Sequence, residues 1–393
     1  MLDYGQVLEL LTDDERQVQA TARDFLDTEA MPGITDAWEK GEFPKDLIPK
    51  LGKMGYLGAN LPSEYGTAGV NNMAYGLLMY ELERVDSGLR SFASVQGALV
   101  MYPIYSYGSE EQKQNYLPKM AAGEMIGCFG LTEHEGGSDP GAMKTTARKD
   151  GESYILNGSK MWITNSPKAD FICLLANTSD DKPHVNKSLI VVPKDAGGIT
   201  VDKPLNKLGM RSSETAQVFF DDVRVPQRNL IGQEGMGFMM QMMQFQEERL
   251  WGAANAIKGC ENLIAQTIDY ARERQVFGMS LLDNQSVHFK LAELQTEVEM
   301  LRALVWQACE TYINGGDVLR LASMAKLKAG RLSREVADGC MQYWGGNGSM
   351  WDNPASQLYR DGRLGSIGGG ADEVMLGIIC KTMGMLPGKK KNS

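Results

Sequence analysis

The chain has 393 residues, of which 43% are apolar and 23% are charged, and it carries a net charge of −10. This length predicts two or three domains, and the composition is typical of a globular protein, so extensive disorder is excluded. No run of about 18 apolar residues is present to cross a membrane. The acidic balance argues against nucleic acid as a partner, and the lone basic cluster, Lys389 to Lys391, predicts a solvated tail.

The first part of the chain predicts helices. Apolar residues recur at three- and four-residue steps, and Gly, Ser or Pro bounds each segment. These signals indicate helices at residues 16–30, after Pro44, and at residues 72–85, 92–107 and 109–122. We therefore expect an N-terminal helical domain over residues 1–125.

The middle of the chain predicts strands. Short apolar runs alternate with turn residues at 154–156, 161–163, 171–175, 188–192 and 218–220. Asn157-Gly158 separates two such runs and predicts a tight hairpin turn. We therefore expect a β domain over residues 126–235.

The rest of the chain returns to helical spacing, with segments at residues 238–274, 283–313, 318–344 and 371–385. Long helices with apolar stripes on more than one side predict a bundle that also packs against other subunits. We expect this bundle over residues 236–393. One of its stripes is formed by Leu291, Leu294, Val298, Leu301 and Val305.

Cysteine and histidine usage restricts the chemistry. The six cysteines are scattered without a Cys-x-x-Cys pair, which predicts buried free thiols in a reducing compartment. The acidic first 16 residues resemble neither a secretory signal nor a transit peptide, so a cytoplasmic location is expected. With three distant histidines and no expected metal site, the chemistry must depend on carboxylates, arginines and a cofactor.

Two motifs lie close together where the helical block meets the β block. A glycine-rich turn offers free backbone N–H groups to a ring system or a phosphate. About thirty residues later, a strand ends in a tryptophan and a threonine. The motifs read Cys128-Phe-Gly-Leu-Thr-Glu-His-Glu-Gly-Gly-Ser-Asp-Pro140 and Met161-Trp-Ile-Thr-Asn165.

With these motifs the chain resembles the acyl-CoA dehydrogenase family of flavoproteins over nearly its whole length. Further matching stretches are Arg274-Gln-Val-Phe-Gly278, Asp283-Asn-Gln285, Gln342-Tyr-Trp-Gly-Gly-Asn-Gly348 and Tyr359-Arg-Asp361. The resemblance implies a mainly α fold with a central β domain: an N-terminal α-domain, a β-barrel domain and a C-terminal four-helix bundle. It also implies a homotetramer that binds FAD between subunits.

The resemblance carries cofactor roles onto particular residues. Those facing the flavin would be Phe129, Leu131, Thr132, Gly137, Ser138, Trp162 and Thr164, with Ser138 also near the pantetheine. Those holding the adenine end of a neighbouring subunit's FAD would be Arg274, Phe277, Gln285, Gln342 and Gly346. A guanidinium suits a pyrophosphate, although Arg274 could instead pair with Glu273 or Asp283 on the surface.

The expected reaction needs a base for the α-proton, donors for the thioester oxygen and exclusion of water. Most family members carry the base in a late Tyr-Glu-Gly-Thr stretch, but Gly369 stands at that position here. In the isovaleryl- and long-chain types the base instead precedes an arginine on the first bundle helix. Glu248 holds that position, and the Gly369 N–H would still serve the thioester oxygen. Asp372 and Glu373 are the rival bases.

The acyl group is less certain, because the chain combines two precedents. Stretches around residues 244–251, 289–294 and 366–374 resemble citronellyl-CoA dehydrogenases, and the first half resembles glutaryl-CoA dehydrogenases. Arg90, Ser91 and Ser94 match the residues that hold a distal carboxylate in the second group, unless Arg90 pairs with Glu83 or Asp86. We therefore expect a dicarboxylic mono-CoA ester, with an uncharged branched acyl-CoA as the alternative. The further substrate-binding residues implied are Ser138, Phe245 and Arg249.

Three classes of function compete. The first is a dehydrogenase that passes electrons to an electron-transferring flavoprotein. The second is an oxidase or a non-oxidative relative on the same fold. The third is a flavin-free binding protein, and the retention of nearly every cofactor-facing motif argues against it.

Overall fold

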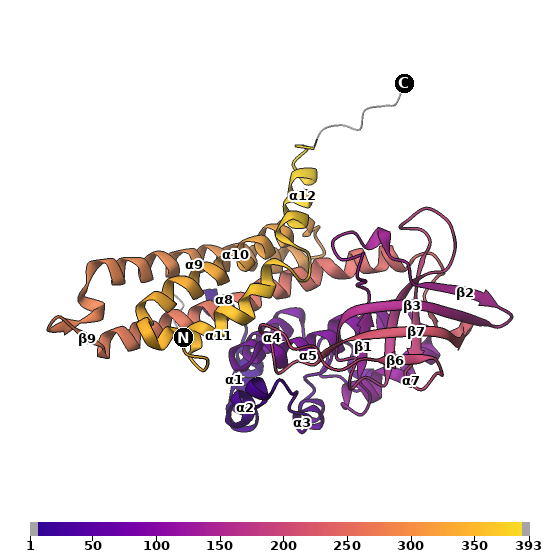
Figure 1. The fold of residues 1–393 in the computed structure, drawn as a ribbon, viewed down its shortest axis with the longest axis horizontal. Helices are drawn as coiled ribbons and strands as arrows, with labels where there is room; N and C mark the ends of the chain where they lie inside the picture. The colour runs from indigo at the N-terminus through magenta and orange to yellow at the C-terminus, as the bar shows by residue number, and fades with distance from the viewer. Residues whose placement is uncertain (1–6, 387–393) are drawn as a thin grey trace. The chain divides into compact units, whose positions relative to one another are not determined.

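The computed structural model describes residues 7–386, so the predicted tail at Lys389 to Lys391 lies outside the described residues (Figure 1). The chain divides into two compact units. One spans Asp13–Phe245, and the other comprises, among the described residues, 246–386 together with 7–12. None of the described helices is both long enough and apolar enough to cross a membrane.

The first unit begins with helices whose ends are capped by polar side chains. Asn71 accepts the Ala74 N–H at 2.8 Å, and Ser109 forms a reciprocal capping box with Gln112. The helix predicted at 92–107 includes a π-helical stretch, Val95–Met101, and α2 was not predicted. The α-helices are α1 (Asp13–Glu29), α2 (Met31–Lys40), α3 (Leu47–Lys53), α4 (Asn72–Val85), α5 (Ser87–Ser94), α6 (Tyr102–Tyr107) and α7 (Glu110–Ala121).

The second half of this unit is a sheet. Within the described residues eight strands join it, in the order β6-β7-β3-β2-β4-β5-β8, with β1 pairing parallel to β4. The longest pairing is the antiparallel one between β3 and β7. The strands are β1 (Gly127–Gly130), β2 (Thr146–Asp150), β3 (Ser153–Thr164), β4 (Phe171–Asn177), β5 (Lys187–Pro193), β6 (Ile199–Val201), β7 (Thr215–Pro226) and β8 (Leu230–Ile231).

The predicted hairpin turn at Asn157-Gly158 is wrong. Strand β3 runs through both residues, and its register against β7 shifts between Leu156 and Gly158, which is a bulge. Gly158 has φ +141° and approaches Thr145 so closely that a Cβ would lie 2.6 Å from the Thr145 hydroxyl. The turn into β3 is instead made around Gly151, at φ +56°. Asn-Gly therefore marks an irregular strand here.

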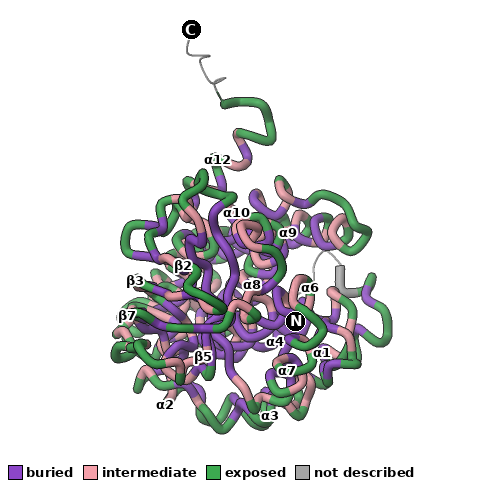
Figure 2. Tube along the Cα trace, turned by 90° about the vertical axis from the view of Figure 1, so that its right-hand side faces the viewer, coloured by how far each residue is buried: buried purple, intermediate pink, exposed green. Residues whose placement is uncertain are grey.

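Strand β4 is buried along its whole length because both of its faces are covered. Cys173 and Leu175 belong to a core cluster that also contains helix residues such as Val100 and Leu117. The alternate residues face a second cluster formed among the strands. Figure 2 shows the neighbouring β5 as similarly buried. The sheet thus rests on the helices through one face.

The second unit consists of long helices and a small hairpin. The predicted stripe from Leu291 to Val305 is buried, as expected, and α11 was not predicted. Helix α8 begins in the first unit and continues into this one. The elements are α8 (Gly237–Glu273), β9 (Gln275–Val276), β10 (Met279–Ser280), α9 (Gln285–Ile313), α10 (Leu319–Trp344), α11 (Pro354–Asp361) and α12 (Asp372–Thr382).

Short 3₁₀ helices connect the elements of both units. They are Val7–Leu10, Ser63–Tyr65, Pro140–Ala142, Gln227–Asn229, Leu281–Asp283, Gly345–Ser349 and Gly362–Ser366. The six cysteines carry free thiols; five are buried and Cys380 is partly exposed.

Candidate active site

A buried ion pair holds the loop between β1 and β2. The Lys160 ammonium, with no exposed surface, donates to Glu133 Oε1 at 2.8 Å and to the Leu131 carbonyl at 3.0 Å. Glu133 also accepts the N–H groups of Lys144 at 2.5 Å and Thr145 at 3.0 Å. Burial lowers the pKa of Lys160 to about 8. Burial opposes the charged form of Glu133 too, but Lys160 and the N–H donors outweigh it and lower the Glu133 pKa.

The end of β3 lies beside this loop. The Met161 N–H donates to the Thr132 carbonyl at 2.8 Å, which joins the two predicted motifs. Trp162 lies where the register of β3 against β7 shifts; it has φ +59° and is 55% exposed. The Thr164 hydroxyl lies 3.5 Å from that of Thr215 on β7. An exposed indole beside polar groups is thus a suitable surface for a flat ligand.

The other predicted flavin-facing residues divide into two kinds. Gly137 and Ser138 are exposed at the turn, and a Cβ at Gly137 would meet no atom within 4 Å. Leu131 and Thr132 are partly buried. Phe129 is buried in the core cluster shared with the helices, so its ring packs between the sheet and those helices.

In the second unit, a glycine turn precedes α12. Gly369 and Gly370 have φ +64° and +103°, values that favour glycine. A Cβ at Gly369 would lie 3.9 Å from Glu248 Oε1 of α8. A Cβ at Gly370 would lie 2.6 Å from the Met375 methyl group. The structure therefore brings the Glu248 carboxylate beside the glycine turn that precedes α12.

Two buried cations accompany the Glu248 carboxylate. Arg249 is buried, and its Nε has no hydrogen-bond partner among residues 7–386. Burial lowers the pKa of Arg249, although the Glu248 charge opposes this. Lys326 of α10 is 6% exposed and donates to the Gly370 carbonyl. Burial lowers the Lys326 pKa to about 8, against the charges of Asp372 and Glu248.

The adjacent glutamates, Glu247 and Glu248, have different surroundings. Trp251 Nε1 donates to Glu247 Oε1 at 3.1 Å, and the Tyr312 hydroxyl donates to its Oε2 at 3.0 Å. Glu247 is therefore buried and hydrogen-bonded through both oxygens. Glu248 is partly exposed and faces the glycine turn. Of the two, Glu248 is better placed to accept a proton.

The rival late carboxylates are less suited to that role. Asp372 is buried, and its Oδ2 lies 3.2 Å from Arg331 Nε and 3.7 Å from Arg334 Nη2. Two guanidinium groups therefore already hold this oxygen. Glu373, the next residue on α12, is exposed.

The predicted adenine-binding residues lie near the far end of α8. Phe277 is fully exposed at φ +50° in the β9–β10 hairpin. The Arg274 side chain has no ion-pair or hydrogen-bond partner within the described part of the chain, so the surface pairs with Glu273 and Asp283 do not form. Both side chains are thus displayed without a packing role in this unit.

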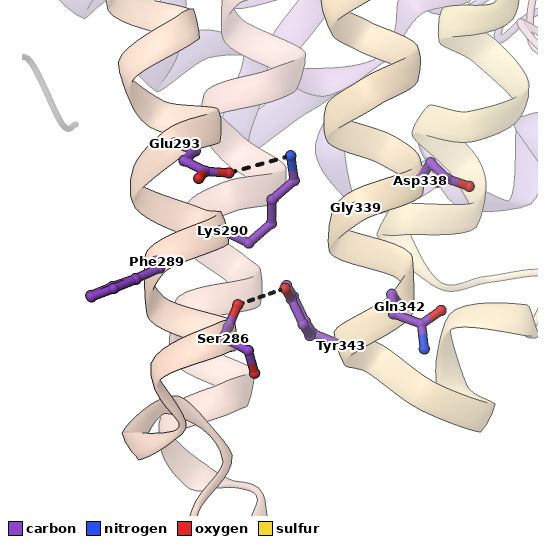
Figure 3. Close-up of a pocket in the computed structure, with 8 residues that line it drawn as sticks. All are labelled: Ser286, Phe289, Lys290, Glu293, Asp338, Gly339, Gln342 and Tyr343. Atoms are coloured by element: carbon purple, nitrogen blue, oxygen red, sulfur yellow. Dashed lines mark hydrogen bonds and ion pairs between the residues drawn. The ribbon is translucent and has the colours of Figure 1, made fainter.

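A groove between α9 and α10 contains Gln342 (Figure 3). Its volume is about 550 Å³. Tyr343 points toward Ser286 and donates to its carbonyl at 3.1 Å. Gln285 and Gly346 are exposed nearby in sequence, and a Cβ at Gly346 would meet nothing within 4 Å. Room for a ligand therefore exists beside Gln342, one of the predicted adenine-binding residues.

Arg90 has a protein partner. Its Nε donates to Glu83 Oε2 at 2.7 Å, with 21% and 11% of the two side chains exposed. Asp86, the other alternative, instead caps α5 by accepting the Leu89 N–H. Ser91 and Ser94 are partly buried on the same helix. Phe245 packs against the core cluster of the first unit.

Sequence reasoning missed Lys160, Glu133 and Lys326, whereas Glu83 was named as a possible partner of Arg90. Alternate residues of a strand face the same side of the sheet. Lys160 lies an even number of residues after the buried Tyr154 and Leu156 on β3, and this spacing was the signal that its side chain is buried. Lys326 likewise falls in the buried stripe of α10. A lysine at an inward position requires a buried partner, and that requirement is readable from the pattern.

Comparison with known proteins gives the class. Sequence models of acyl-CoA dehydrogenase domains match three consecutive parts: the N-terminal domain over residues 12–124, the middle domain over 128–223 and the C-terminal domain over 235–384. The chain belongs to the acyl-CoA dehydrogenase family. An acyl-CoA dehydrogenase of Bacillus subtilis (strain 168) is 37% identical over 371 residues, 94% of this chain and 98% of that protein. This chain is accordingly an oxidoreductase that acts on the CH–CH group of an acyl-CoA.

Solved structures agree with the fold. Glutaryl-CoA dehydrogenase of Mycobacterium smegmatis, in complex with FADH2, is similar with a TM-score of 0.93 and 35% identity, covering 99% of each chain. A chain of the electron transferring flavoprotein structure from Acidaminococcus fermentans is similar with a TM-score of 0.91 and 34% identity, covering 95% of this chain and 98% of that one. The acyl-CoA dehydrogenase fold predicted from the motifs is confirmed.

The family uses FAD, and the residues present fit that cofactor. In the first unit, the displayed Trp162 and the open space above Gly137 are features that a flat ring would cover. In the second unit, Phe277 is exposed and the space above Gly346 is open. When bound, FAD supplies an acceptor for hydride. On the side of the isoalloxazine ring, the residues expected to hold it are Leu131, Thr132, Gly137, Ser138, Trp162 and Thr164.

Proposed function

We propose that this chain oxidises an acyl-CoA thioester to the enoyl-CoA with Glu248 as the base. Glu248 takes the α-proton, and the two electrons of the α C–H bond form the new double bond. The acceptor for the β-hydrogen, which would leave as hydride, would be FAD held by the residues named above. The Gly369 N–H donates to the thioester oxygen, where negative charge develops. The supporting observation is that Glu248 Oε1 lies 3.9 Å from the Cβ position of Gly369.

The test is anaerobic mixing of the FAD-loaded protein with a panel of acyl-CoA thioesters. The panel contains straight, branched and carboxyl-ended acyl chains of matched length. We expect at least one thioester to bleach the flavin absorption completely in a single turnover and to yield the enoyl-CoA. Failure of every thioester to bleach a fully loaded flavin would refute the proposal.

Two acyl groups compete as the substrate. A dicarboxylic mono-CoA ester needs a cation for its distal carboxylate. Arg90 could serve, because Glu83 accepts only from its Nε and the other two guanidinium nitrogens do not bind Glu83. The ion pair between Arg90 and Glu83 instead favours an uncharged branched acyl chain. Glu83 balances the charge of Arg90, and a second carboxylate would be repelled by the first. This charge balance gives the uncharged branched chain the better support.

Two variants distinguish these substrates. If the substrate is uncharged, Arg90→Met changes the turnover of a carboxyl-ended thioester and of its methyl-ended isostere equally, and the parent prefers the isostere. If the substrate is a dicarboxylic mono-CoA ester, Arg90→Met impairs only the carboxyl-ended thioester. Glu83→Gln is the matched partner variant, because it leaves Arg90 unbalanced and should improve binding of the carboxyl-ended ester.

The electron acceptor and assembly complete the proposal. We infer an electron-transferring flavoprotein as acceptor, a homotetramer and a cytoplasmic location, the last from six cysteines that all remain free thiols. Slow reoxidation of the reduced enzyme by oxygen, with fast reoxidation by an electron-transferring flavoprotein, would support the first. Rapid reoxidation by oxygen would favour the oxidase alternative. Light scattering of the FAD-loaded protein tests the tetramer.

A further inference from the structure

The helix that follows the predicted acyl-binding residues of α5 changes its hydrogen-bond register. The chain continues from α5 into the π-helical stretch Val95–Met101, whose bonds join an N–H to the carbonyl five residues earlier. The Tyr102 N–H accordingly donates to the Gly97 carbonyl. The same step from Ala98 falls on Pro103, which has no N–H. Continuing this register therefore leaves the Ala98 carbonyl without a donor from its own helix.

A glutamine from another element supplies the missing donor. Gln244, in the part of α8 that lies in the first unit, donates its side-chain N–H to the Ala98 carbonyl. That carbonyl can only accept, so Gln244 must present its nitrogen there and keep its Oε1 for a second donor. Gln241 Nε2 donates to this Oε1 at 2.7 Å. The two glutamines are 2% and 0% exposed, and this buried amide chain joins α8 to the π-helical stretch.

The two joined elements carry residues that are predicted to bind the acyl group. Ser91, Ser94 and Ala98 follow one another at three- and four-residue steps, and all three are partly exposed. They therefore share a face of the helix that the core does not fully cover. On α8, Phe245 directly follows Gln244 and packs against the core cluster to which the π-helical stretch contributes. The bond from Gln244 thus fixes the separation between the two sets of residues.

Stability alone does not account for this amide chain. Its far end, Gln241 Oε1, has no hydrogen-bond partner within residues 7–386. An incompletely bonded buried amide stabilises a core no better than an apolar side chain of the same shape. A hydrogen bond nevertheless restricts distance and direction, whereas apolar contact is non-directional. The glutamines therefore specify one spacing of the two elements more narrowly than leucines would.

We propose that Gln244 is a positioning residue that sets acyl-chain selectivity. Its bond to the Ala98 carbonyl holds α8 and the π-helical stretch at one separation, and this separation limits the shape of the acyl group accepted beside Ser94 and Phe245. This inference rests on the proposed function, because it requires an acyl-CoA substrate that contacts these two residues. Gln244 acts through the spacing of the elements and is not required to touch the substrate.

The experiment measures selectivity in the FAD-loaded protein. The second-order rate constant of anaerobic flavin reduction is measured for uncharged straight and branched acyl-CoA thioesters of matched length. The selectivity ratio is the constant for the shape that the parent prefers divided by that for the other. Gln244→Leu nearly preserves the volume and removes the bond. Gln112→Leu is the matched control, because Gln112 is also buried and donates to the carbonyls of Arg228 and Leu230, outside both joined elements.

We expect the selectivity ratio to fall about 10-fold in Gln244→Leu, the size of effect that a pocket exerts on one methylene group. Gln112→Leu should keep the parent ratio within about twofold, even if its melting temperature falls. A ratio in Gln244→Leu within about twofold of the parent would overturn the proposal. A parent that accepts both shapes equally would also overturn it, because no selectivity would exist for Gln244 to set.

A double variant separates positioning from satisfaction of the carbonyl. Pro103→Ala supplies a backbone N–H at the step from Ala98 where the π register lacks one. Combined with Gln244→Leu, it gives the carbonyl a donor without restoring the link to α8. The selectivity ratio should stay low in this double variant. Recovery of the parent ratio would refute positioning by Gln244.

Gln244→Asn covers the case in which Gln244→Leu does not fold. Its amide is one methylene group shorter, so the position stays polar while the bond to the Ala98 carbonyl is lost. The selectivity ratio should fall here too, and a parent-like ratio would count against the proposal. The proposed function fails separately, when no thioester bleaches the flavin of the parent. A parent that bleaches and whose Gln244 variants keep its ratio refutes only the role of Gln244.

Discussion

Moving the base from α8 to the glycine turn is the most demanding test of the site. The double variant Glu248→Gly with Gly369→Glu exchanges the two positions. The Cβ of residue 369 would lie 3.9 Å from the present position of Glu248 Oε1. A glutamate carboxylate oxygen extends roughly 3.5 Å beyond its Cβ, given bonds of about 1.5 Å. The transplanted carboxylate can therefore reach the place that the present one occupies.

The expected magnitudes follow from this geometry. Removing the base alone, as Glu248→Gln, should lower the rate of flavin reduction about 10²- to 10⁴-fold. The double variant should recover to within about 10- to 100-fold of the parent, because a residual misplacement near 1 Å costs about that much. Placing a side chain at φ +64° should also cost about 1–2 kcal/mol of stability.

The assay is anaerobic stopped-flow bleaching of the flavin at saturating acyl-CoA. Glu247→Gln is the matched control, because Trp251 and Tyr312 hold that carboxylate and its removal should affect stability more than rate. The assignment of Glu248 is refuted if Glu248→Gln reacts within threefold of the parent. It is also refuted if the double variant is no faster than Glu248→Gln while still binding acyl-CoA.

Three further predictions concern stability and cofactor binding. Lys160→Met leaves Glu133 buried without its cation and should destabilise the protein by about 3–5 kcal/mol, measured by denaturant unfolding of the FAD-loaded protein; an unchanged midpoint would contradict the anchoring role. Glu81 has a pKa held below 4.5 by Arg23 and neighbouring donors that outweigh burial, so its contribution to stability is present above pH 4.5 and is lost as pH falls through the lower folded value. Glu81→Gln should flatten the decline of stability below pH 4.5, and an equally steep decline would disprove this. Arg274→Met should weaken FAD retention on gel filtration without changing the melting temperature of the apoprotein, since the side chain has no partner in the described chain; parent-like retention would exclude a cofactor role.

The sequence was sufficient for the long, regular elements and for the family motifs. Helix α4 was predicted with the same bounds, and the stripe from Leu291 to Val305 is buried as its spacing indicated. The glycine at residue 369 and the glutamate at residue 248 predicted Glu248 as the base, and a Cβ at Gly369 would lie 3.9 Å from Glu248 Oε1. Both predictions depend on local periodicity or on linear motifs, which the sequence contains explicitly.

Other features depend on contacts between distant segments. Asn157-Gly158 forms a bulge because Gly158 must approach Thr145, a contact that no local propensity contains. Arg90 had two candidate carboxylates, and the break between α4 and α5 at Asp86 decided in favour of Glu83. The partner of a side chain is determined by how helices and strands pack together. A single sequence predicts that packing only when it resembles a family of known fold.

The conformation of Trp162 sets the stability of the protein against its function at one residue position. A glycine there would relieve roughly 1–2 kcal/mol of left-handed strain, against roughly 0.5–1 kcal/mol of added chain entropy. Only part of the packing would be lost, because 55% of this residue is exposed. A library screened only for heat resistance would therefore tolerate or enrich this replacement, while discarding the ring that the flavin would lie against. Stabilisation campaigns on this scaffold should hold position 162 constant and seek their gains elsewhere.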